Sequence, residues 1–184
     1  ANEKLFIFHF PDLLAPTLVS HSIADLRAFM REQSGQMIVK PLDGYAGLSV
    51  FNVREDDSNT GAILETMTHH GKRWVMAQRK LDVKGKGDKR ILLLDGEFLA
   101  ALLRLPAQNE LRSNLALGGT AQATELTPRE REICERVKPR LRQEGLHFVG
   151  LDVIDGHLTE INVTSPTGIQ AANRLYNERF ERRI

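Results

Sequence analysis

The chain has 184 residues, of which 41% are hydrophobic and 27% charged, and its 25 Lys and Arg against 24 Asp and Glu give a formal net charge of +1. This length and composition predict one domain, or at most two small ones, and exclude a mainly disordered chain. The balanced charge lacks the basic excess that accompanies non-specific nucleic-acid binding, so we expect no nucleic-acid partner.

Cysteine content and hydropathy indicate the compartment. The single cysteine, Cys134, excludes an internal disulfide and a cysteine-rich zinc site, and we expect it to be a small core residue of a cytoplasmic protein. The longest early apolar run, 5–10, ends at Pro11 and is far shorter than the ~20 residues that span a bilayer, so we expect no signal peptide and no membrane partner. Because the chain begins at Ala1 and its first residues have the pattern of ordered protein, we expect a fragment of a longer chain.

The first half of the sequence alternates between helical and extended patterns. Ser22 and Asp25 open a stretch with apolar residues at helical spacing, which Gly35 ends, and this predicts a helix over 22–33. The segments that follow are a strand over 36–40, a turn over 41–47, a strand over 48–53, a helix over 59–70, a strand over 73–78 and a flexible basic loop over 84–87.

The second half contains two hairpin signals and two helices. Asp95-Gly96 predicts a tight turn between strands over 88–94 and 97–105, and the aperiodic stretch 106–126 predicts a long loop. Thr127 and Glu130 have the spacing of a capping box, so a helix begins there and ends at Gly145. The remaining segments are strands over 147–154 and 158–163 around Asp155-Gly156, and a charged terminal helix over 169–184.

The last hairpin carries three candidate metal ligands, Asp152, Glu160 and Asn162. Glu160 and Asn162 share a face of their strand because strand side chains alternate. Oxygen donors without Cys or His suit Mg²⁺ or Mn²⁺, especially when a substrate phosphate completes the coordination. The alternative interpretation is a solvated hairpin face with ordinary polar residues.

The metal interpretation depends on the strand register. With a strict two-residue turn, Leu151 would lie opposite Glu160, and Asp152 would face away from it. A shared metal therefore requires a three-residue loop over 155–157, which pairs Asp152 with Glu160 and Gly150 with Asn162, unless a bulge restores the same facing.

Two groups of cationic residues are candidate sites for anionic ligands. Lys40 precedes a turn with Gly44 and Gly47, where backbone N–H groups and the ammonium can meet a phosphate; the alternative is a β-turn with a surface lysine. The guanidinium groups in or beside the first hairpin match carboxylate or phosphate, and the alternative for each is an ordinary surface arginine. These arginines are Arg90, Arg104 and Arg112.

In order and spacing, these segments resemble the ATP-grasp domain of the bacterial glutathione synthetase family, and the resemblance covers nearly the whole chain. The most specific motif is Glu160-Ile161-Asn162-Val163-Thr164-Ser165-Pro166. The other motifs that carry the resemblance are Asn2-Glu3-Lys4-Leu5, Lys40-Pro41-Leu42-Asp43-Gly44, Met76-Ala77-Gln78, Gly87-Asp88-Lys89-Arg90, and Arg112-Ser113-Asn114-Leu115 with Gly118-Gly119.

The resemblance implies an α+β ATP-grasp fold of two subdomains whose antiparallel sheets hold ATP between them. Residues 1–80 would form the lysine and glycine-loop subdomain, and residues 81–184 the metal and substrate subdomain. The implied reaction is the ligation of γ-glutamylcysteine and glycine: the γ-phosphate of ATP activates the peptide carboxylate as an acyl phosphate, and the amine of glycine displaces phosphate. The products would be glutathione, ADP and phosphate.

The resemblance also implies roles for individual residues. Lys4 and Lys40 would contact ATP phosphates beside Gly44 and Gly47, and the strand with Met76 and Gln78 would lead into the adenine site. Asp152, Glu160 and Asn162 would hold two Mg²⁺ or Mn²⁺ ions. The acyl phosphate and the peptide carboxylates would be surrounded by Arg90 and Arg112, both catalytic, together with Arg104, Asn114, Gly118, Gly119, Ser165 and Thr167.

The sequence departs from the family pattern in two places. Ala46 stands where the family usually has a glycine, and the hinge over 78–82 lacks the usual aromatic residue and proline. We also expect that this fragment lacks the leading domain, which in the family contributes to substrate binding and oligomer contacts. Two other functions therefore remain as alternatives: a related ATP-grasp carboxylate-amine ligase with another acceptor, and a nucleotide-binding module without turnover. A homo-oligomer is the expected form if the protein assembles.

Overall fold

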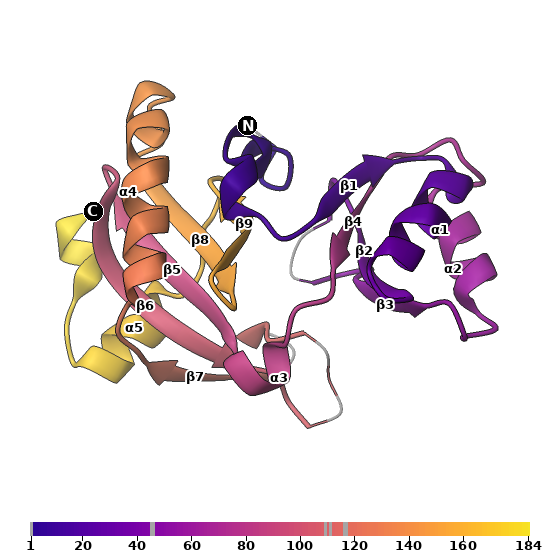
Figure 1. Ribbon diagram of the computed structural model, residues 1–184. Coiled ribbons are helices and arrows are strands. Elements are labelled where there is room, and N and C mark those ends of the chain that lie inside the picture. Colours follow the sequence, from indigo (N-terminus) through magenta and orange to yellow (C-terminus); the bar gives the residue numbers. More distant parts are fainter. Residues whose placement is uncertain (1, 45–46, 109, 111, 116–117) are drawn as a thin grey trace. The chain divides into compact units, whose positions relative to one another are not determined.

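The computed structural model describes residues 2–44, 47–108, 110, 112–115 and 118–184 (Figure 1). The chain forms two compact units, one of residues 15–81 with Asn2, and the other of residues 3–14 and 82–184. The chain passes from the first of these units to the second between residues 81 and 82, close to the expected subdomain boundary. Residues 3–14, which we placed in the first subdomain, instead pack with the second unit, because their 3₁₀ turn contacts the last strand of its sheet.

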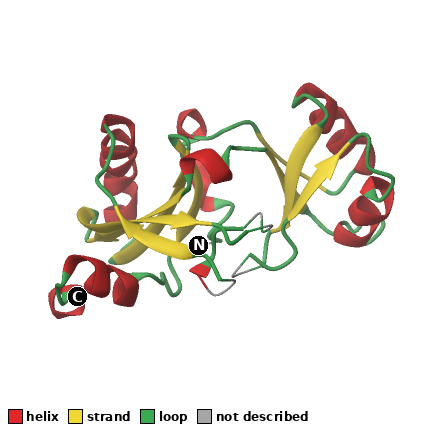
Figure 2. Ribbon diagram, turned by 90° about the horizontal axis from the view of Figure 1, so that it is seen from below, coloured by secondary structure: helices red, strands yellow, loops and turns green. Residues whose placement is uncertain are grey.

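The unit of residues 15–81 is a four-stranded antiparallel sheet covered on one face by two helices (Figure 2). Its strands lie in the order β1 (Thr17–Ser20), β4 (Val75–Arg79), β2 (Gln36–Pro41) and β3 (Phe51–Arg54), and its helices are α1 (Ile23–Glu32) and α2 (Thr60–Met67). Apolar residues of both helices and of alternate strand positions form its core, among them Leu26, Met30, Val39, Leu64 and Ala77. This alternation leaves the other face of the sheet to Lys40, Met76 and Gln78.

Three details of this unit differ from the sequence prediction. Strand β1 was not predicted, because its four residues are too few to show a clear strand pattern. Its extended conformation is stabilised by pairing with β4. Strand β3 begins at Phe51 instead of residue 48, because Gly47 and Ser49 have φ of 74° and 57°, which an extended strand does not allow. Helix α2 ends at Met67 instead of residue 70, because His69 and His70 also have positive φ.

The other unit is built on a five-stranded antiparallel sheet with a helix on each face (Figure 1). Helix α4 (Pro128–Gln143) begins with the predicted capping box at Thr127 and Glu130, and Glu130 reaches Lys89 of β5. Helix α5 (Ile169–Tyr176) packs on the opposite face of the sheet, where Ala171 and Ala172 share a core cluster with Leu92 and Leu102. The strands lie in the order β7 (Thr120–Ala123), β6 (Glu97–Leu105), β5 (Asp88–Leu94), β8 (Phe148–Ile154) and β9 (His157–Asn162).

Short elements account for the differences in this unit. The predicted loop 84–87 overlaps helix α3 (Val83–Lys86), which begins where the Asp82 carboxylate accepts a hydrogen bond from the Gly85 N–H. The predicted loop 106–126 contains β7 at its end, paired with β6. The terminal helix ends at Tyr176 because Asn177 adopts the left-handed conformation, and 3₁₀ turns lie at Phe180–Arg183, Phe6–His9 and Pro11–Leu13.

The α+β class with antiparallel sheets is confirmed. Cys134 is buried in α4, as expected of a core residue, and burial, together with Glu135 and Glu130, raises the pKa of its thiol to about 12. Among the described residues, no helix combines the length and the apolar character needed to cross a membrane.

Candidate functional site

A row of charged residues crosses the five-stranded sheet on the face that α5 covers. Arg90 on β5 lies directly opposite Asp152 on β8, and Asp152 lies opposite Glu160 on β9. Directly opposite residues project to the same face, so strand pairing alone brings these three side chains together. Asp88 and Arg104 lie opposite each other on β5 and β6 and extend the charged surface beside this row.

The pairing of Asp152 with Glu160 and of Gly150 with Asn162 is confirmed, but the predicted three-residue loop is wrong. Ile154 pairs with His157 across a two-residue turn, in which Asp155 and Gly156 both have positive φ. The register is shifted instead by a bulge that makes Thr159 an extra residue of β9. The Thr159 hydroxyl donates to the backbone carbonyl oxygen of Asp152 at 3.0 Å, which holds the bulge against β8.

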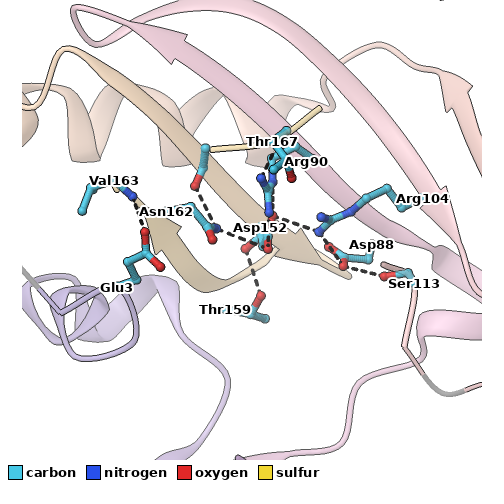
Figure 3. A network of polar contacts seen from close by, with 11 residues as sticks. Glu3, Asp88, Arg90, Arg104, Ser113, Asp152, Thr159, Asn162, Val163 and Thr167 are labelled. Atoms are coloured by element: carbon cyan, nitrogen blue, oxygen red, sulfur yellow. Dashed lines mark hydrogen bonds and ion pairs between the residues drawn. The ribbon is translucent and has the colours of Figure 1, made fainter. Parts of the chain in front are cut away.

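Asp152 lies between two guanidinium groups (Figure 3). Arg90 donates from Nε to Oδ1 at 2.6 Å and from Nη2 to Oδ2 at 3.0 Å, and Arg104 approaches Oδ1 with Nη2 at 2.9 Å. Burial acts to raise the pKa of Asp152, but the attraction of Arg104 and Arg90 outweighs it and holds the pKa well below the usual range of a carboxyl group. Asp152 is therefore a fixed negative charge at the centre of the network.

Arg104 connects this pair to a second carboxylate. Its Nη2 also donates to Asp88 Oδ2 at 2.6 Å, and the same oxygen accepts a hydrogen bond of 2.6 Å from Ser113 Oγ (Figure 3). Burial acts to lower the pKa of Arg104, but Asp152 and Asp88 together raise it. Two buried polar atoms of this pair, Arg104 Nε and Asp88 Oδ1, have no hydrogen-bond partner within the described part of the chain.

The N-terminal segment holds the outer end of the row. Lys4 Nζ is buried and contacts Glu160 Oε1 at 3.0 Å. The Glu3 carbonyl oxygen accepts from the Ile161 N–H, and Glu3 Oε1 accepts from the Val163 and Thr164 N–H groups at 2.8 and 2.9 Å. These contacts fix the chain that leads from β9 toward the expected substrate residues.

Ser165 and Thr167 lie in that following segment. Arg90 Nη1 donates to the Thr167 carbonyl oxygen at 2.9 Å, so Arg90 contacts both the hairpin of β8 and β9 and the segment after it. A Cβ atom built on Gly150 would lie 3.1 Å from both Arg90 Cδ and Pro166 Cβ, closer than most real Cβ contacts. Gly150 thus provides the space in which Arg90 crosses β8.

The three expected metal ligands have the donor chemistry of a site for Mg²⁺ or Mn²⁺. Asn162 donates through Nδ2 to the Gly150 carbonyl oxygen at 3.2 Å and lies 3.4 Å from Asp152 Oδ2, which leaves its amide oxygen as the acceptor. No group of three or more His, Cys, Asp and Glu side chains gathers at metal-binding distance among the described residues. The residues fit a cation that also takes oxygens from a bound phosphate group.

The expected nucleotide residues of the other unit share one face of its sheet. Lys40 on β2 pairs directly with Met76 on β4, and both are buried. Gln78 lies on the same face, and its Nε2 donates to Thr17 Oγ1 at 3.0 Å. The structure therefore brings Lys40, Met76 and Gln78 together within this unit.

The glycines after β2 permit a close turn. A Cβ atom at Gly44 would lie 2.6 Å from Pro41 Cγ, and Gly47 has a φ of 74°. Asp43 in this turn forms an ion pair with Arg73. Ala46, the departure from the family pattern, lies outside the described residues.

Arg112 forms a bidentate ion pair with Glu110, from Nε to Oε1 at 3.0 Å and from Nη2 to Oε2 at 2.8 Å. It follows Glu110 by two residues and precedes the Ser113 that contacts Asp88. Gly118 has a φ of 85°, and a Cβ atom on Gly119 would lie 2.7 Å from the Ser113 carbonyl oxygen and 3.0 Å from that of Asn114. The two glycines thus let the returning chain pack on residues 113–114.

Sequence reasoning missed several members of the network. Glu3, Asp88 and Ser113 belong to motifs that carried the resemblance, but no role was assigned to them. Strand alternation was the signal that was available for Asp88, since a residue two positions before Arg90 shares its face. The contacts of Glu3 and Ser113 join distant segments and have no local signal.

The sequence matches a known family over residues 3–177, described as the ATP-grasp domain of prokaryotic glutathione synthetase. The glutathione synthetase of Bradyrhizobium diazoefficiens is 53% identical over 176 residues, which cover 95% of this chain and 55% of that protein. The chain thus spans little more than half the length of that relative.

Solved structures share the fold at low sequence identity. The crystal structure of the D-cycloserine synthetase DcsG is similar with a TM-score of 0.72 and 19% identity, over 99% of this chain and 70% of the other. The ATP-grasp ligase PsnB complexed with minimal precursor is similar with a TM-score of 0.64 and 19% identity, over 92% of this chain and 53% of the other. The expected ATP-grasp fold is thereby confirmed.

Proposed function

Since the chain belongs to the ATP-grasp family of prokaryotic glutathione synthetases, we propose that it is the ATP-grasp part of a ligase that joins γ-glutamylcysteine and glycine. The match over residues 3–177 carries the proposal more than any other observation. The charged row of Arg90, Asp152 and Glu160 supports it, because a phosphoryl-transfer site needs charge at fixed positions more than it needs a nucleophile.

The proposed reaction has two steps. A carboxylate oxygen of γ-glutamylcysteine attacks the γ-phosphorus of ATP, the bond from that phosphorus to ADP breaks, and an acyl phosphate forms. The amine of glycine then attacks the acyl carbon, inorganic phosphate leaves, and the amine loses a proton. Neither step requires a covalent bond to the protein, which agrees with a chain whose single cysteine is buried.

In this proposal the cationic side chains bind and orient the anionic groups. Lys4 and Lys40 bind ATP phosphates beside Gly44 and Gly47, and Met76 and Gln78 lie along the adenine site. Within the described part of the chain Arg90 directs three of its five N–H groups to Asp152 and Thr167, and the other two would be available to the acyl phosphate.

The substrate groups have their own proposed set of residues. Arg112 would serve with Arg90 as a catalytic residue, and both guanidinium groups would stabilise the charge that develops on the transferred phosphoryl group. The residues that complete the substrate site are Arg104, Asn114, Gly118, Gly119, Ser165 and Thr167.

Asp152, Glu160 and Asn162 would hold two Mg²⁺ or Mn²⁺ ions. When bound, such ions neutralise phosphate charge and orient the phosphoryl group. We also propose a cytoplasmic location, where ATP and both substrates are present, and assembly as a homo-oligomer.

Phosphate release from ATP, measured with each substrate omitted in turn, tests the proposal. Release that requires both γ-glutamylcysteine and glycine is the expected result. Release with glycine replaced by another amine, but not with glycine, would identify a related ligase with another acceptor. ATP binding without release under any of these conditions would leave a nucleotide-binding module.

A further inference from the structure

The side chain of Glu3 accepts hydrogen bonds from two consecutive backbone N–H groups on a distant part of the chain. Its Oε1 atom lies 2.8 Å from the Val163 nitrogen and 2.9 Å from the Thr164 nitrogen (Figure 3). Strand β9 lies at the edge of the sheet and ends at Asn162, so these two N–H groups lie beyond the last pair of the β8–β9 ladder. The partly buried carboxylate therefore accepts hydrogen bonds that no neighbouring strand accepts.

The backbone of Glu3 and the side chain of Lys4 hold the adjoining part of β9. The Glu3 carbonyl oxygen accepts a hydrogen bond from the Ile161 N–H at 3.1 Å, and Lys4 Nζ contacts Glu160 Oε1 at 3.0 Å. Together with the contacts of the Glu3 carboxylate, these bonds involve the chain from residue 160 to residue 164. The two N-terminal residues thus fix both the end of β9 and the start of the segment after it.

The segment after β9 has no regular structure of its own. Residues 163–168 form neither a helix nor a strand before α5 begins. Glu3 holds the near end of this segment, and Arg90 Nη1 holds the far end through the Thr167 carbonyl oxygen at 2.9 Å. The position of Ser165, between these two contacts, therefore depends on both.

An ionised carboxylate suits this position better than an amide does. A charged oxygen forms stronger hydrogen bonds with backbone N–H groups than a neutral amide oxygen does. Both N–H groups converge on the same oxygen, Oε1 of Glu3, so one charge serves two donors. Glutamine at this position would keep the length of the side chain and an acceptor oxygen but lose the charge, and alanine would lose the acceptor as well.

Glu3 and Lys4 are neighbours in the chain but contact different parts of the proposed site. Lys4, which we propose to bind ATP phosphates, contacts the expected metal ligand Glu160. Glu3 contacts the segment that carries Ser165 and Thr167, two residues of the proposed substrate site. One dipeptide is therefore bound to both the phosphate side and the substrate side.

We propose that Glu3 is a positioning residue, which holds Val163 and Thr164 so that Ser165 and Thr167 meet the peptide substrate. The substrate part of this inference rests on the proposed function. The anchoring of the two N–H groups does not, because it follows from the hydrogen bonds alone.

Hydrogen exchange of the 184-residue chain, followed by NMR, tests the anchor without any activity. In Glu3→Ala we expect exchange at the Val163 and Thr164 amides to become about ten times faster, because each amide loses a hydrogen bond to a charged group. Glu3→Gln should give a smaller rise, since an acceptor oxygen remains. Exchange in β5, at the centre of the same sheet, should change in neither variant.

Glu178→Ala is the matched control, because Glu178 is an exposed glutamate of the same unit. We expect it to leave exchange at Val163 and Thr164 unchanged. Unchanged exchange at these two amides in either Glu3 variant would overturn the anchor. An equally large rise in β5 would also overturn it, because the effect would then be a loss of overall stability. Glu3→Gln decides the question by itself if Glu3→Ala does not fold.

Steady-state kinetics tests the substrate part in the protein that contains this chain. We expect Glu3→Gln to raise the KM for γ-glutamylcysteine several-fold. The KM for ATP should stay unchanged, because the Glu3 carbonyl oxygen keeps its contact with Ile161 and Lys4 stays in place. Glu178→Ala should change neither KM.

The two measurements separate the parts of the inference. Faster amide exchange with an unchanged KM for the peptide would overturn the substrate role and keep the anchor, and so would a rise in the KM for ATP alone. A wild-type protein without turnover of γ-glutamylcysteine and glycine would overturn the proposed function and the substrate role together, while the exchange rates still decide the anchor.

Discussion

Arg90 and Asp152 form a bidentate ion pair across two neighbouring strands, from Nε to Oδ1 at 2.6 Å and from Nη2 to Oδ2 at 3.0 Å. Their backbones are direct partners in the pairing of β5 and β8, so the sheet register itself sets the geometry of the pair. Both side chains are largely buried, at 6% and 11% exposure. Removing one partner therefore leaves a buried charge that water cannot reach.

Replacing Asp152 with Asn should lower the free energy of unfolding by about 3–5 kcal/mol near neutral pH, because Arg90 and Arg104 lose their shared counter-charge. Urea denaturation of the wild type and of D152N measures the difference. Asp56→Asn is the control, since Asp56 forms an exposed ion pair with Arg54 and should change the free energy of unfolding by less than about 1 kcal/mol.

The contribution of Asp152 should also depend on pH. The pKa of Asp152 is lowered in the folded chain, so as the pH falls the unfolded chain takes up the proton first. Stability from this group is fully present above the ordinary carboxyl pKa of about 3.9 and is lost as the pH falls through the lower, folded value. The difference between wild type and D152N should stay constant between about pH 7 and pH 5 and shrink below about pH 4. A difference that already shrinks near pH 6 would show that the pKa is not lowered.

Gly150→Ala should displace Arg90 and destabilise the second unit. The added Cβ atom would lie 3.1 Å from Arg90 Cδ and from Pro166 Cβ, and overpacking of this kind costs about 1–3 kcal/mol. Thermal denaturation measures the loss. Gly61→Ala is the matched control, because its Cβ atom would meet only Arg27 Nη2 at an ordinary 3.4 Å and a helical alanine is favoured over glycine. Equal stability of Gly150→Ala and wild type would contradict the close crossing of Arg90.

Lys40→Met should weaken ATP binding by about ten- to a hundredfold, since a charged hydrogen bond to phosphate is lost while most of the buried stem is kept. Isothermal titration in the presence of Mg²⁺ measures the affinity, and exposed Lys72→Met is the control. Replacing Mg²⁺ with EDTA should weaken binding to the wild type as well. Equal affinity of wild type with Mg²⁺ and with EDTA would count against the metal site.

Arg112→Ala should reduce turnover far more than ATP affinity, because the proposed contacts of Arg112 are with the peptide and the acyl phosphate. The measurement is kcat and KM for each substrate in a protein that is active, together with ATP titration. Arg174, exposed on α5, provides the control substitution to Ala. An unchanged specific activity of Arg112→Ala would remove this residue from the site.

The elements that were predicted correctly are those whose signals are local. The capping box at Thr127 and Glu130 fixes the start of α4, and Asp95-Gly96 fixes the turn between β5 and β6, because each acts within a few residues. Strands β1 and β7 have four residues each and depend on β4 and β6 for their order, so the chain around them carries no comparable signal.

The candidate site shows the same division. Strand alternation correctly places Glu160 and Asn162 on one face, and the pairing with Asp152 follows once the register is known. Either a three-residue turn or a bulge can pair Asp152 with Glu160, and the sequence spacing is compatible with both. The contacts of Asp88 with Ser113 and of Glu3 with Val163 join residues far apart in the chain, and side-chain periodicity indicates a face but not a partner.

The bulge at Thr159 lies between the turn and the pair of Asp152 and Glu160. The number of residues in the hairpin therefore does not by itself determine that these two residues are paired. Deleting Thr159 would join Leu158 directly to Glu160 and give a regular hairpin in which Asp152 still faces Glu160. A chain one residue shorter at this point can thus keep the same pair. The pairing of the two carboxylates therefore does not require one fixed number of residues between them, because the chain with Thr159 and the chain without it give the same facing.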